Sequence, residues 1–260
     1  MNNIHPSAII DSKAELGTGN TIAAHCVIEA DVTLGNNNTL HHGAILKNGS
    51  RIGDGNSFYE YSVMAGCPQD VSFDKQAQTL LEIGDNNEFR EYTTVNRASL
   101  KEQGITKLGN NNYLMAHAHI GHDCQLADNI VMVVSSGLGG HVHVDRNAFI
   151  SGGVMVHQFT RIGAYAMIGG NAKITQDVLP FFITDGIPAS VKGINVVGLK
   201  RAGFKRADIS DLKQAYRLLF SAGLPLEQII EQLKDINSNL IKELTEFLLG
   251  SKRGFHRVER

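Results

Sequence analysis

The 260-residue sequence predicts a mainly β protein, in which a parallel β-helix is followed by a C-terminal α-helical domain. Three observations predict this fold: large apolar residues recur every six positions, small residues recur in step with them, and a helical period takes over near residue 196. A period of six suits neither an α-helix nor a simple alternating strand. It suits a short strand plus a corner, so that three repeats close one triangular coil and the coils stack into a prism.

The six-residue repeat lies within residues 1–190, which we expect to form the prism. Its apolar anchor residues run from Ile4 to Met64, from Ile83 to Val95 and from Leu108 to Ile174, which makes 26 repeats. Each anchor should point inward, stacked on the anchor three repeats before it. The residue four places after the anchor is small or Asn in most repeats and should fill the remaining interior. Glycine often follows the anchor directly, as a corner with a crowded backbone or a positive φ requires.

Two breaks in the repeat predict loops that leave the prism, at residues 70–82 and 101–107. Loops held on a rigid scaffold often carry function, although a tolerated surface insertion gives the same pattern. From residue 191 to residue 260 we expect a helical domain that covers one end of the solenoid. Apolar stripes at helical spacing predict three helices there, with stripes from Ile209 to Phe220, from Leu226 to Leu233 and from Leu240 to Leu248.

The composition excludes several classes of protein. A hydrophobic content of 42% excludes a disordered chain, and no run of 18 apolar residues is present that would span a membrane. Three widely spaced cysteines argue against a disulfide framework and fit a reducing cytoplasm. Cys26 and Cys124 occupy the inward small position and are expected to be inert core thiols, whereas Cys67 has no such place in the repeat.

Charge is unevenly distributed along the chain, although the net formal charge is only −2. Residues 1–191 carry 11 basic and 18 acidic side chains, whereas residues 192–260 carry 13 basic and 8 acidic ones. The basic end indicates either a solvated helical surface or a contact with an acidic partner or a phosphorylated ligand. Nucleic acid is disfavoured, because the basic residues lack a nucleic-acid-binding motif and interleaved aromatic side chains.

Six of the eleven histidines lie between residues 117 and 157, on coils that should stack on one another. A register of three repeats per coil puts His122, Gly140 and Gln158 on one line along the prism, with Asp123 and His141 beside it. Alternation along the strands points His117, His119 and His141 outward, because each lies next to an inward residue.

Two chemistries suit this histidine cluster. A neutral His122, oriented by the Asp123 carboxylate, would act as a general base, and the backbone N–H of Gly140 would bind the oxyanion of an attacked carbonyl. Three imidazoles that converge from stacked coils would instead hold Zn²⁺. A solvated surface is the third interpretation, and the residues alone leave all three open.

Several segments together resemble a known family. They are PQD at 68–70, HIGHDC at 119–124, GGH at 139–141, HQF at 157–159, QDV at 176–178 and NVVGLKRAGF at 195–204. With the repeat, both loops and the helical tail, the chain is similar over essentially its whole length to the acyl-carrier-protein-dependent UDP-N-acetylglucosamine O-acyltransferases of lipid A biosynthesis. The resemblance implies a left-handed prism, a homotrimer with active sites between subunits, a cytoplasmic location, and no metal, cofactor or covalent enzyme intermediate.

The resemblance also implies roles for individual residues. His122 would take the proton from the glucosamine 3-hydroxyl, whose oxygen then attacks the thioester of a 3-hydroxyacyl carrier protein. Gly140 would donate to the oxyanion, Asp123 would orient His122, and the basic tail would meet the acidic carrier protein. Gly170 matches the position that limits acyl-chain length, and its small size implies a longer chain. Contacts with the nucleotide sugar or the acyl donor are implied for Gln69, Asp70, His119, His141, His157, Gln158, Asn195 and Arg201.

The chain departs from the family pattern at a few positions. Ser72 stands where relatives usually carry Lys, so we expect phosphate contacts to have moved, with Lys75 as the candidate. Val197, Ala202 and His117 stand where Glu, a second basic residue and Asn are common. We expect these departures to change the preference for sugar or chain rather than to abolish activity.

Four alternatives remain beside the O-acyltransferase. The first is the same chemistry on a 3-amino analogue of the sugar. The second is the N-acyltransferase of the same pathway, which is disfavoured because the repeat begins at Ile4 and leaves no room for an extra domain before the prism. The third is a zinc-dependent, prism-shaped lyase, and the fourth is a binding scaffold without catalysis.

Overall fold

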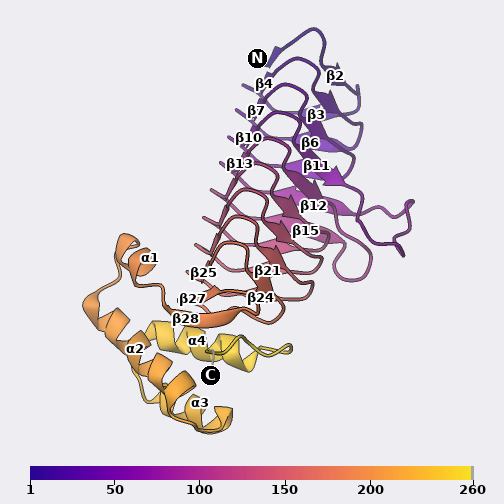
Figure 1. The fold of residues 1–260 in the computed structure, drawn as a ribbon. Helices are drawn as coiled ribbons and strands as arrows, with labels where there is room; N and C mark the ends of the chain where they lie inside the picture. Colours follow the sequence, from indigo (N-terminus) through magenta and orange to yellow (C-terminus); the bar gives the residue numbers. More distant parts are fainter. Residues whose placement is uncertain (259–260) are drawn as a thin grey trace.

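The computed structural model, which describes residues 1–258, is a left-handed parallel β-helix with α-helices at its C-terminal end (Figure 1). Short strands wind into three sheets, and strands paired within a sheet lie three repeats apart wherever no loop intervenes, as in Ile4 opposite Ile22. The predicted fold class is therefore confirmed. The strand pairs within residues 1–258 are parallel except that of β27 with β28, which is antiparallel and lies next to the helices.

The three sheets form the faces of the prism. Sheet A comprises β1 (Asn3–Ile4), β4 (Thr21–Ile22), β7 (Thr39–Leu40), β10 (Ser57–Phe58), β13 (Glu88–Phe89), β16 (Tyr113–Leu114), β19 (Val131–Met132), β22 (Phe149–Ile150), β25 (Met167–Ile168), β27 (Phe182–Asp185) and β28 (Ser190–Ile194). Sheet B comprises β2 (Ile9–Ile10), β5 (Val27–Ile28), β8 (Ile45–Leu46), β11 (Val63–Gly66), β14 (Thr94–Asn96), β17 (His119–Ile120), β20 (Gly137–Leu138), β23 (Met155–Val156) and β26 (Lys173–Ile174). Sheet C comprises β3 (Glu15–Leu16), β6 (Val32–Leu34), β9 (Ser50–Ile52), β12 (Leu80–Ile83), β15 (Ile105–Leu108), β18 (Gln125–Leu126), β21 (His143–Val144) and β24 (Arg161–Ile162).

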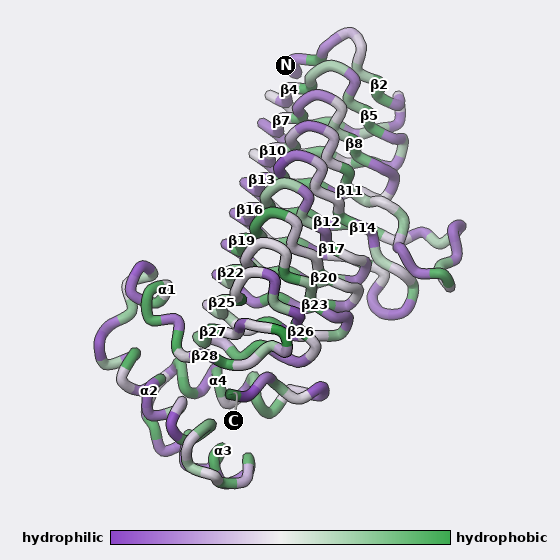
Figure 2. The backbone as a smooth tube through the Cα atoms, viewed as in Figure 1, coloured by the Kyte–Doolittle hydropathy of each residue, from purple (hydrophilic) through white to green (hydrophobic). Residues whose placement is uncertain are grey.

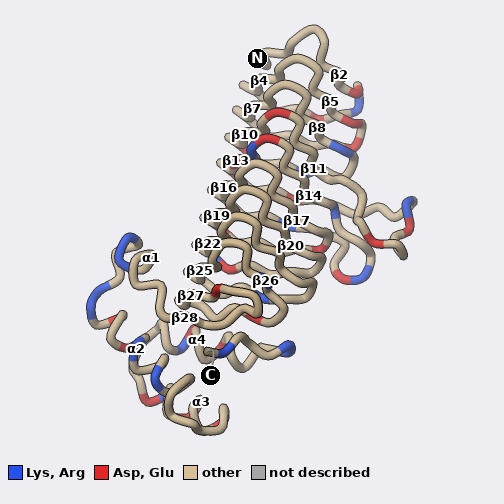
Figure 3. Tube along the Cα trace, in the orientation of Figure 1, with Lys and Arg blue, Asp and Glu red and all other residues tan. Residues whose placement is uncertain are grey.

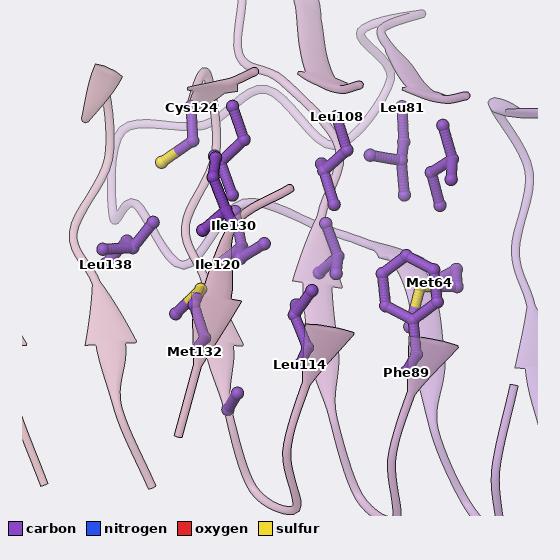
Figure 4. Close-up of a cluster of buried hydrophobic side chains, with 14 of the residues drawn as sticks. Met64, Leu81, Phe89, Leu108, Leu114, Ile120, Cys124, Ile130, Met132 and Leu138 are labelled. Atoms are coloured by element: carbon purple, nitrogen blue, oxygen red, sulfur yellow. The ribbon is translucent and has the colours of Figure 1, made fainter. Parts of the chain in front are cut away.

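The anchor residues fill the interior of the prism, as the repeat predicts. From Ile22 to Ile174 every anchor is buried, and anchors of successive coils stack, as the parallel rings of Phe58 and Phe89 do at 5.1 Å between centroids. Figure 4 shows part of this column of side chains, and Figure 2 shows hydrophobic and hydrophilic residues alternating along the coils. Cys26 and Cys124 lie in the core, where burial raises the pKa of the Cys124 thiol to about 12, so both are inert core thiols.

A ladder of asparagines occupies the inward position four residues after the anchor on one edge of the prism. Asn56 lies in the middle of it: its side-chain oxygen accepts hydrogen bonds from the backbone N–H and the amide of Asn87 (2.9 and 3.0 Å). Its own amide donates to Asn38 Oδ1 and to the Gly84 carbonyl (3.1 and 3.0 Å). The ladder thus satisfies backbone groups that no strand pairing reaches. Its members are Asn20, Asn38, Asn56, Asn87 and Asn112.

Replacing Asn56 by Ala should destabilise the prism strongly. The change leaves the backbone N–H and side-chain amide of Asn87, and the carbonyl of Gly84, without these partners in a dry interior. Each buried group left unpaired lowers the free energy of unfolding by about 1–3 kcal/mol. We expect thermal unfolding of the full-length protein to show the loss as a clearly lower midpoint. Asn237→Ala, at an exposed position, should leave the free energy of unfolding unchanged within about 0.5 kcal/mol and the midpoint close to native. Equal midpoints for the two variants would contradict a structural role for the ladder.

Both loops begin and end earlier in the chain than the sequence predicts. The first runs between the end of β11 at Gly66 and the start of β12 at Leu80, and the second between Asn96 and Ile105. The predicted ranges 70–82 and 101–107 are therefore wrong at their C-terminal ends, where residues 80–82 and 105–107 are strand. The reason is that β12 and β15 are four-residue strands paired with each other from Leu80 opposite Ile105 onward, so each begins before its anchor.

The glycines that follow the anchors are explained by backbone crowding and not by a positive φ. At Gly17, Gly35 and Gly53, directly after the anchor, an added Cβ would lie 2.5–2.8 Å from a backbone carbonyl oxygen of the next coil, so crowding excludes a side chain. Positive φ falls instead on the third residue after the anchor, which is Asn, Gly or an aromatic residue in many coils. Asp123 and His141, with φ of 60° and 62°, occupy this position.

The helical end begins where the coils stop. The three predicted stripes lie on α2 (Arg206–Ser221), α3 (Leu226–Lys234) and α4 (Asn239–Leu249), and they pack with β27 and β28 into a second core. The predicted domain boundary between residues 190 and 191 falls inside β28, and a short helix that the stripes did not predict, α1 (Val196–Arg201), comes first. Among residues 1–258, no helix is both long and apolar enough to cross a membrane.

Candidate active site

His122 and Asp123 lie at the corner where the chain turns from sheet B into sheet C, directly after β17. The Nδ1 atom of His122 is 2.7 Å from Asp123 Oδ2. The other side of the imidazole ring faces Gly140 on the next coil, where an added Cβ would be 2.7 Å from Nε2. The His122 carbonyl also accepts from the N–H of His141 (2.9 Å), so the stacked register brings together the residues that it predicts to be neighbours.

The Asp123 carboxylate is anionic and held in place. Burial by itself raises the pKa of Asp123, but hydrogen bonds from His122 and from Ser99 outweigh it and hold that pKa below its ordinary value. Ser99 donates to Oδ2 through its backbone N–H (3.0 Å) and through its hydroxyl (2.7 Å). Because an anionic Oδ2 accepts only, the neutral His122 ring carries its proton on Nδ1, which leaves Nε2 with a free lone pair.

Gly140 offers an unpaired hydrogen-bond donor beside this lone pair. The residue is buried, its carbonyl accepts from Phe159 N–H (3.1 Å), and its own N–H has no acceptor within residues 1–258. Buried backbone donors without partners are rare in folded proteins. The free N–H next to the free Nε2 is therefore suited to a bound group that offers an acceptor, such as a carbonyl that becomes an oxyanion.

Two more histidines line this corner. His141 is buried, with its ring stacked on Phe159 at 4.4 Å and edge-on to His122 at 5.1 Å. It does point away from the prism core, as expected, but the second loop covers it, and its Nδ1 lies 3.0 Å from Glu102 Oε1. His119 is half-buried on β17 and its Nδ1 hydrogen-bonds to Thr94 Oγ1 at 2.8 Å. Burial and the nearby His122 lower the pKa of His119, so its ring is neutral at pH 7.

The remaining predicted contacts on this edge are exposed. His157 and Gln158 follow β23, one coil beyond Gly140, and His157 Nδ1 lies 3.1 Å from the Gln158 carbonyl. Gln69 is exposed on the first loop. His117 is exposed and stacks on Tyr92 at 5.1 Å, at a different corner of the coil.

Asp70 anchors the first loop to the second. Its carboxylate accepts from Lys101 Nζ (2.5 Å) and from the N–H and hydroxyl of Ser72 (2.9 and 2.8 Å). These donors, Lys101 first, hold the pKa of Asp70 well below its ordinary value. Lys75, the expected replacement for a phosphate contact, lies elsewhere: it lines a separate hollow of about 790 Å³ with Cys67 and Arg97.

A second group of predicted residues lies on another face of the prism. Asn195, Val197, Arg201 and Ala202 line a hollow of about 520 Å³ along sheet A, together with Tyr165 and other residues. The Asn195 amide is already engaged, because its oxygen accepts from Gly198 N–H (3.0 Å) to cap α1 and its nitrogen donates to the Tyr165 carbonyl (2.9 Å). One chain therefore does not bring Asn195 and Arg201 to His122.

Gly170 is exposed, and an added Cβ would touch only the Gly152 carbonyl oxygen, at 3.6 Å. A larger side chain at this position would extend into open space beside the prism rather than into the core. The structure thus leaves space there for an extended ligand. A larger side chain at position 170 would occupy part of this space without disturbing the coils.

The donor atoms of His122, Asp123 and His141 lie within 4.8 Å of one another, which is close enough to hold a metal ion. This set contains two imidazoles, whereas the zinc interpretation requires three. At 2.7 Å, moreover, Nδ1 and Oδ2 share a proton, and an ion would need the space between them. The geometry fits a hydrogen-bonded base better than a metal centre.

Ser99, Glu102 and Thr106 contact the site although the sequence did not single them out. Ser99 and Glu102 reach Asp123 and His141, and Thr106 Oγ1 accepts from the N–H of Asp123 (2.8 Å). The register could not find them, because the second loop interrupts the spacing of three repeats per coil. The available signal was that all three are polar residues within or two residues before the predicted loop at 101–107.

Comparison with known proteins places the whole chain beside one group. Residues 177–256 match the family model of domain 2 of UDP N-acetylglucosamine O-acyltransferase. The acyl-(acyl-carrier-protein)–UDP-N-acetylglucosamine O-acyltransferase of Alkalilimnicola ehrlichii is 48% identical over 259 residues, 99% of this chain and 100% of that protein. The corresponding protein of Aliarcobacter butzleri is 45% identical over 98% of both chains. The solved UDP-N-acetylglucosamine acyltransferase of Bacteroides fragilis aligns with a TM-score of 0.95 and 35% identity, over 98% of this chain and 100% of that one.

Proposed function

The chain belongs to the family of acyl-carrier-protein-dependent UDP-N-acetylglucosamine O-acyltransferases, and on that premise we propose how its own residues perform the transfer. It is an enzyme that moves an acyl chain from acyl carrier protein to UDP-N-acetylglucosamine. The donor is a 3-hydroxyacyl carrier protein, the acceptor is the glucosamine 3-hydroxyl, and the step opens lipid A biosynthesis. One observation carries the assignment of the site: the free Nε2 of His122 lies beside the unpaired N–H of Gly140.

His122 acts as the general base. Its Nε2 takes the proton of the sugar hydroxyl while the oxygen forms a bond to the thioester carbonyl carbon. The carbonyl becomes a tetrahedral oxyanion, which the N–H of Gly140 stabilises. The C–S bond then breaks, and the leaving thiolate receives the proton from Nε2 of the imidazolium. Asp123 stabilises the imidazolium through its bond to Nδ1, and no step requires a metal, a cofactor or an enzyme-bound acyl group.

The acyl-transfer assay tests this assignment directly. Purified protein should transfer a 3-hydroxyacyl group from carrier protein to UDP-N-acetylglucosamine, with the product identified by mass as the sugar nucleotide plus one acyl chain. Transfer to the 3-amino analogue alone would change the acceptor and leave the chemistry in place. Absence of transfer to either sugar, over a series of chain lengths, would contradict the proposed reaction.

We assign the second group of predicted residues to a neighbouring subunit of a homotrimer. Within one chain Arg201 and Asn195 line the hollow along sheet A, whereas His122 lies at the corner between sheets B and C. A site between subunits, with the sheet A hollow of one copy facing the His122 corner of the next, unites both groups. The forked donors of Arg201 suit the diphosphate of the nucleotide sugar.

Mixed trimers test the shared site. We expect His122→Ala and Arg201→Ala to be nearly inactive alone, and random 1:1 mixtures to recover about a quarter of native activity, because one site in four then pairs two intact residues in a cyclic assembly. Activity would be measured after denaturing and refolding the two variants together, with mass analysis verifying mixed trimers. Mixed trimers without recovered activity would place both residues in one subunit's site.

The basic C-terminal segment is the proposed docking surface for acyl carrier protein. Lys and Arg positions are concentrated along the chain around α1 and the start of α2 (Figure 3), and Lys200, Arg206 and Lys213 line a hollow of about 290 Å³ there. The acidic carrier protein and the phosphate of its pantetheine arm complement this charge. The buried free thiols of Cys26 and Cys124 are compatible with a cytoplasmic location, where this donor would be met.

Gly170 should set the length of the acyl chain. Replacing it by Met fills open space beside the prism, so we expect the rate with the longest accepted donor to fall by about tenfold or more, as pocket contacts of this size do, with shorter donors less affected. Measuring kcat/KM over a series of 3-hydroxyacyl carrier proteins checks this. A native enzyme that turns over only short chains, or a variant with an unchanged length profile, would contradict it.

A further inference from the structure

The segment of residues 97–104, between β14 and β15, contacts three predicted site residues at once. Ser99 donates two hydrogen bonds to Asp123, Lys101 pairs with Asp70 at 2.5 Å, and Glu102 Oε1 lies 3.0 Å from His141 Nδ1. We propose that this segment is the positioning element of the catalytic pair, and that Ser99 is a positioning residue that holds Asp123 in the orientation in which it directs His122. The proposal rests on the function proposed above, in which His122 is the base.

Ser99 is built into the site rather than lying against it. Only 2% of the residue is exposed, and both of its donors reach Asp123 Oδ2, the same oxygen that accepts from His122 Nδ1. The other oxygen, Oδ1, is buried without a partner within residues 1–258. All the bonds that define the carboxylate's rotation therefore converge on one atom, and two of the three come from Ser99.

The hydroxyl proton of Ser99 has a defined direction. Its oxygen accepts from the backbone N–H of Lys101 (3.2 Å), which occupies a lone pair and leaves the proton for Asp123 at 2.7 Å. Lys101 in turn is held by Asp70, on the first loop. The first loop, with its predicted sugar contacts, is thus connected to Asp123, the hydrogen-bond partner of the base, through three consecutive bonds: Asp70 to Lys101, Lys101 to Ser99, and Ser99 to Asp123.

Ser99 also tunes the charge that His122 experiences. Its two donors offset part of the negative charge on Oδ2, so without the hydroxyl the carboxylate would attract the imidazolium form of His122 more strongly. The other charged or titratable groups near the pair are His119 on β17, His141 after β20, and Glu102 and Lys101 on the segment itself. None of them donates to Asp123 Oδ2 at hydrogen-bonding distance among the described residues.

The experiment compares three variants of the full-length enzyme: Ser99→Ala, Ser99→Thr and, as the matched control, Ser136→Ala. Ser136 is equally buried, and its hydroxyl donates only to the Val133 carbonyl (2.7 Å) inside the prism. We expect Ser99→Ala to lower kcat by about tenfold, the loss typical of a hydrogen bond to a charged group, with the KM for the sugar nucleotide changed by less than about twofold. The acid limb of its pH–rate profile should move to higher pH.

Ser99→Thr keeps the hydroxyl and should restore most of kcat and the native profile, whereas Ser136→Ala should change neither. A kcat and acid limb of Ser99→Ala that match the native enzyme would overturn the proposal. So would an equal loss in Ser136→Ala, since that would be a general effect of removing a buried hydroxyl.

A second measurement does not depend on turnover. Nitrogen NMR of the histidine side chains should show the Nδ1–H form of neutral His122 in the native protein, and in Ser99→Ala a mixture of the two tautomers or a midpoint moved to higher pH. This result would stand even if the acyl-transfer assay failed, and so separates the positioning role from the proposed function. An His122 signal identical in both proteins, tautomer and midpoint alike, would overturn the positioning role.

Discussion

Replacing His122 by Ala should reduce acyl transfer by about a thousandfold, because it removes the group whose free lone pair is held toward the Gly140 N–H. The measurement is kcat/KM for transfer from a 3-hydroxyacyl carrier protein to UDP-N-acetylglucosamine. The thermal midpoint should change little, since the ring lies at a corner of the prism and not among the stacked anchors.

His143→Ala is the matched control for this variant. His143 lies on β21 with an exposed side chain that points away from the core, so its removal should leave the rate within about twofold, as for an ordinary surface substitution. If His122→Ala kept a tenth or more of native activity, the base would have to be another residue, and His141 would be the first to examine.

Replacing Gly140 by Ala should reduce transfer by about a hundredfold or more while leaving the donor N–H in place. The added Cβ would lie 2.6 Å from Cε1 and 2.7 Å from Nε2 of His122, and these ring atoms are its nearest neighbours. The ring must therefore move by roughly an ångström, a displacement that can cost 10²-fold in rate when it affects a reacting group. Gly140 has no positive φ, so the backbone itself tolerates Ala.

Steady-state rates and sugar binding together test the Gly140 prediction. We expect kcat to carry the loss, while calorimetric binding of UDP-N-acetylglucosamine weakens far less, because the predicted sugar contacts lie on other residues. An unchanged kcat would mean that the ring has room to shift without effect, and it would argue against a precise placement of Nε2 next to the oxyanion donor.

The sequence predicts the prism because its buried apolar residues recur every six positions. Each anchor meets the anchor three repeats away, so counting alone places His122 against Gly140, and the stripes predict α2 to α4. Counting fails where the loops enter, because the chain returns to the prism after a number of residues that no pattern fixes. Ser99 thus precedes Asp123 by 24 residues, and its contact depends on how the second loop folds back.

Two further features lie beyond such counting. The six residues of α1 are too few to show an apolar stripe, so nothing in the pattern indicated a helix at Val196–Arg201. The proton position on His122 depends on distances of a few tenths of an ångström to Asp123 and on the burial of both groups, which the sequence does not encode position by position. A positive φ was one expectation for the glycine directly after the anchor, whereas the structure places it two residues later, at the third residue after the anchor.

The two ends of the prism differ in a way that gives the molecule a direction. Each coil contacts only its neighbours, and the C-terminal end is sealed by a second core, whereas the first coil leaves its anchor Ile4 42% exposed. Fraying therefore starts at the N-terminal end and dies out coil by coil toward the helices. His122 lies several coils away from this less stable end. Transient local unfolding of the first coils therefore leaves the catalytic corner folded.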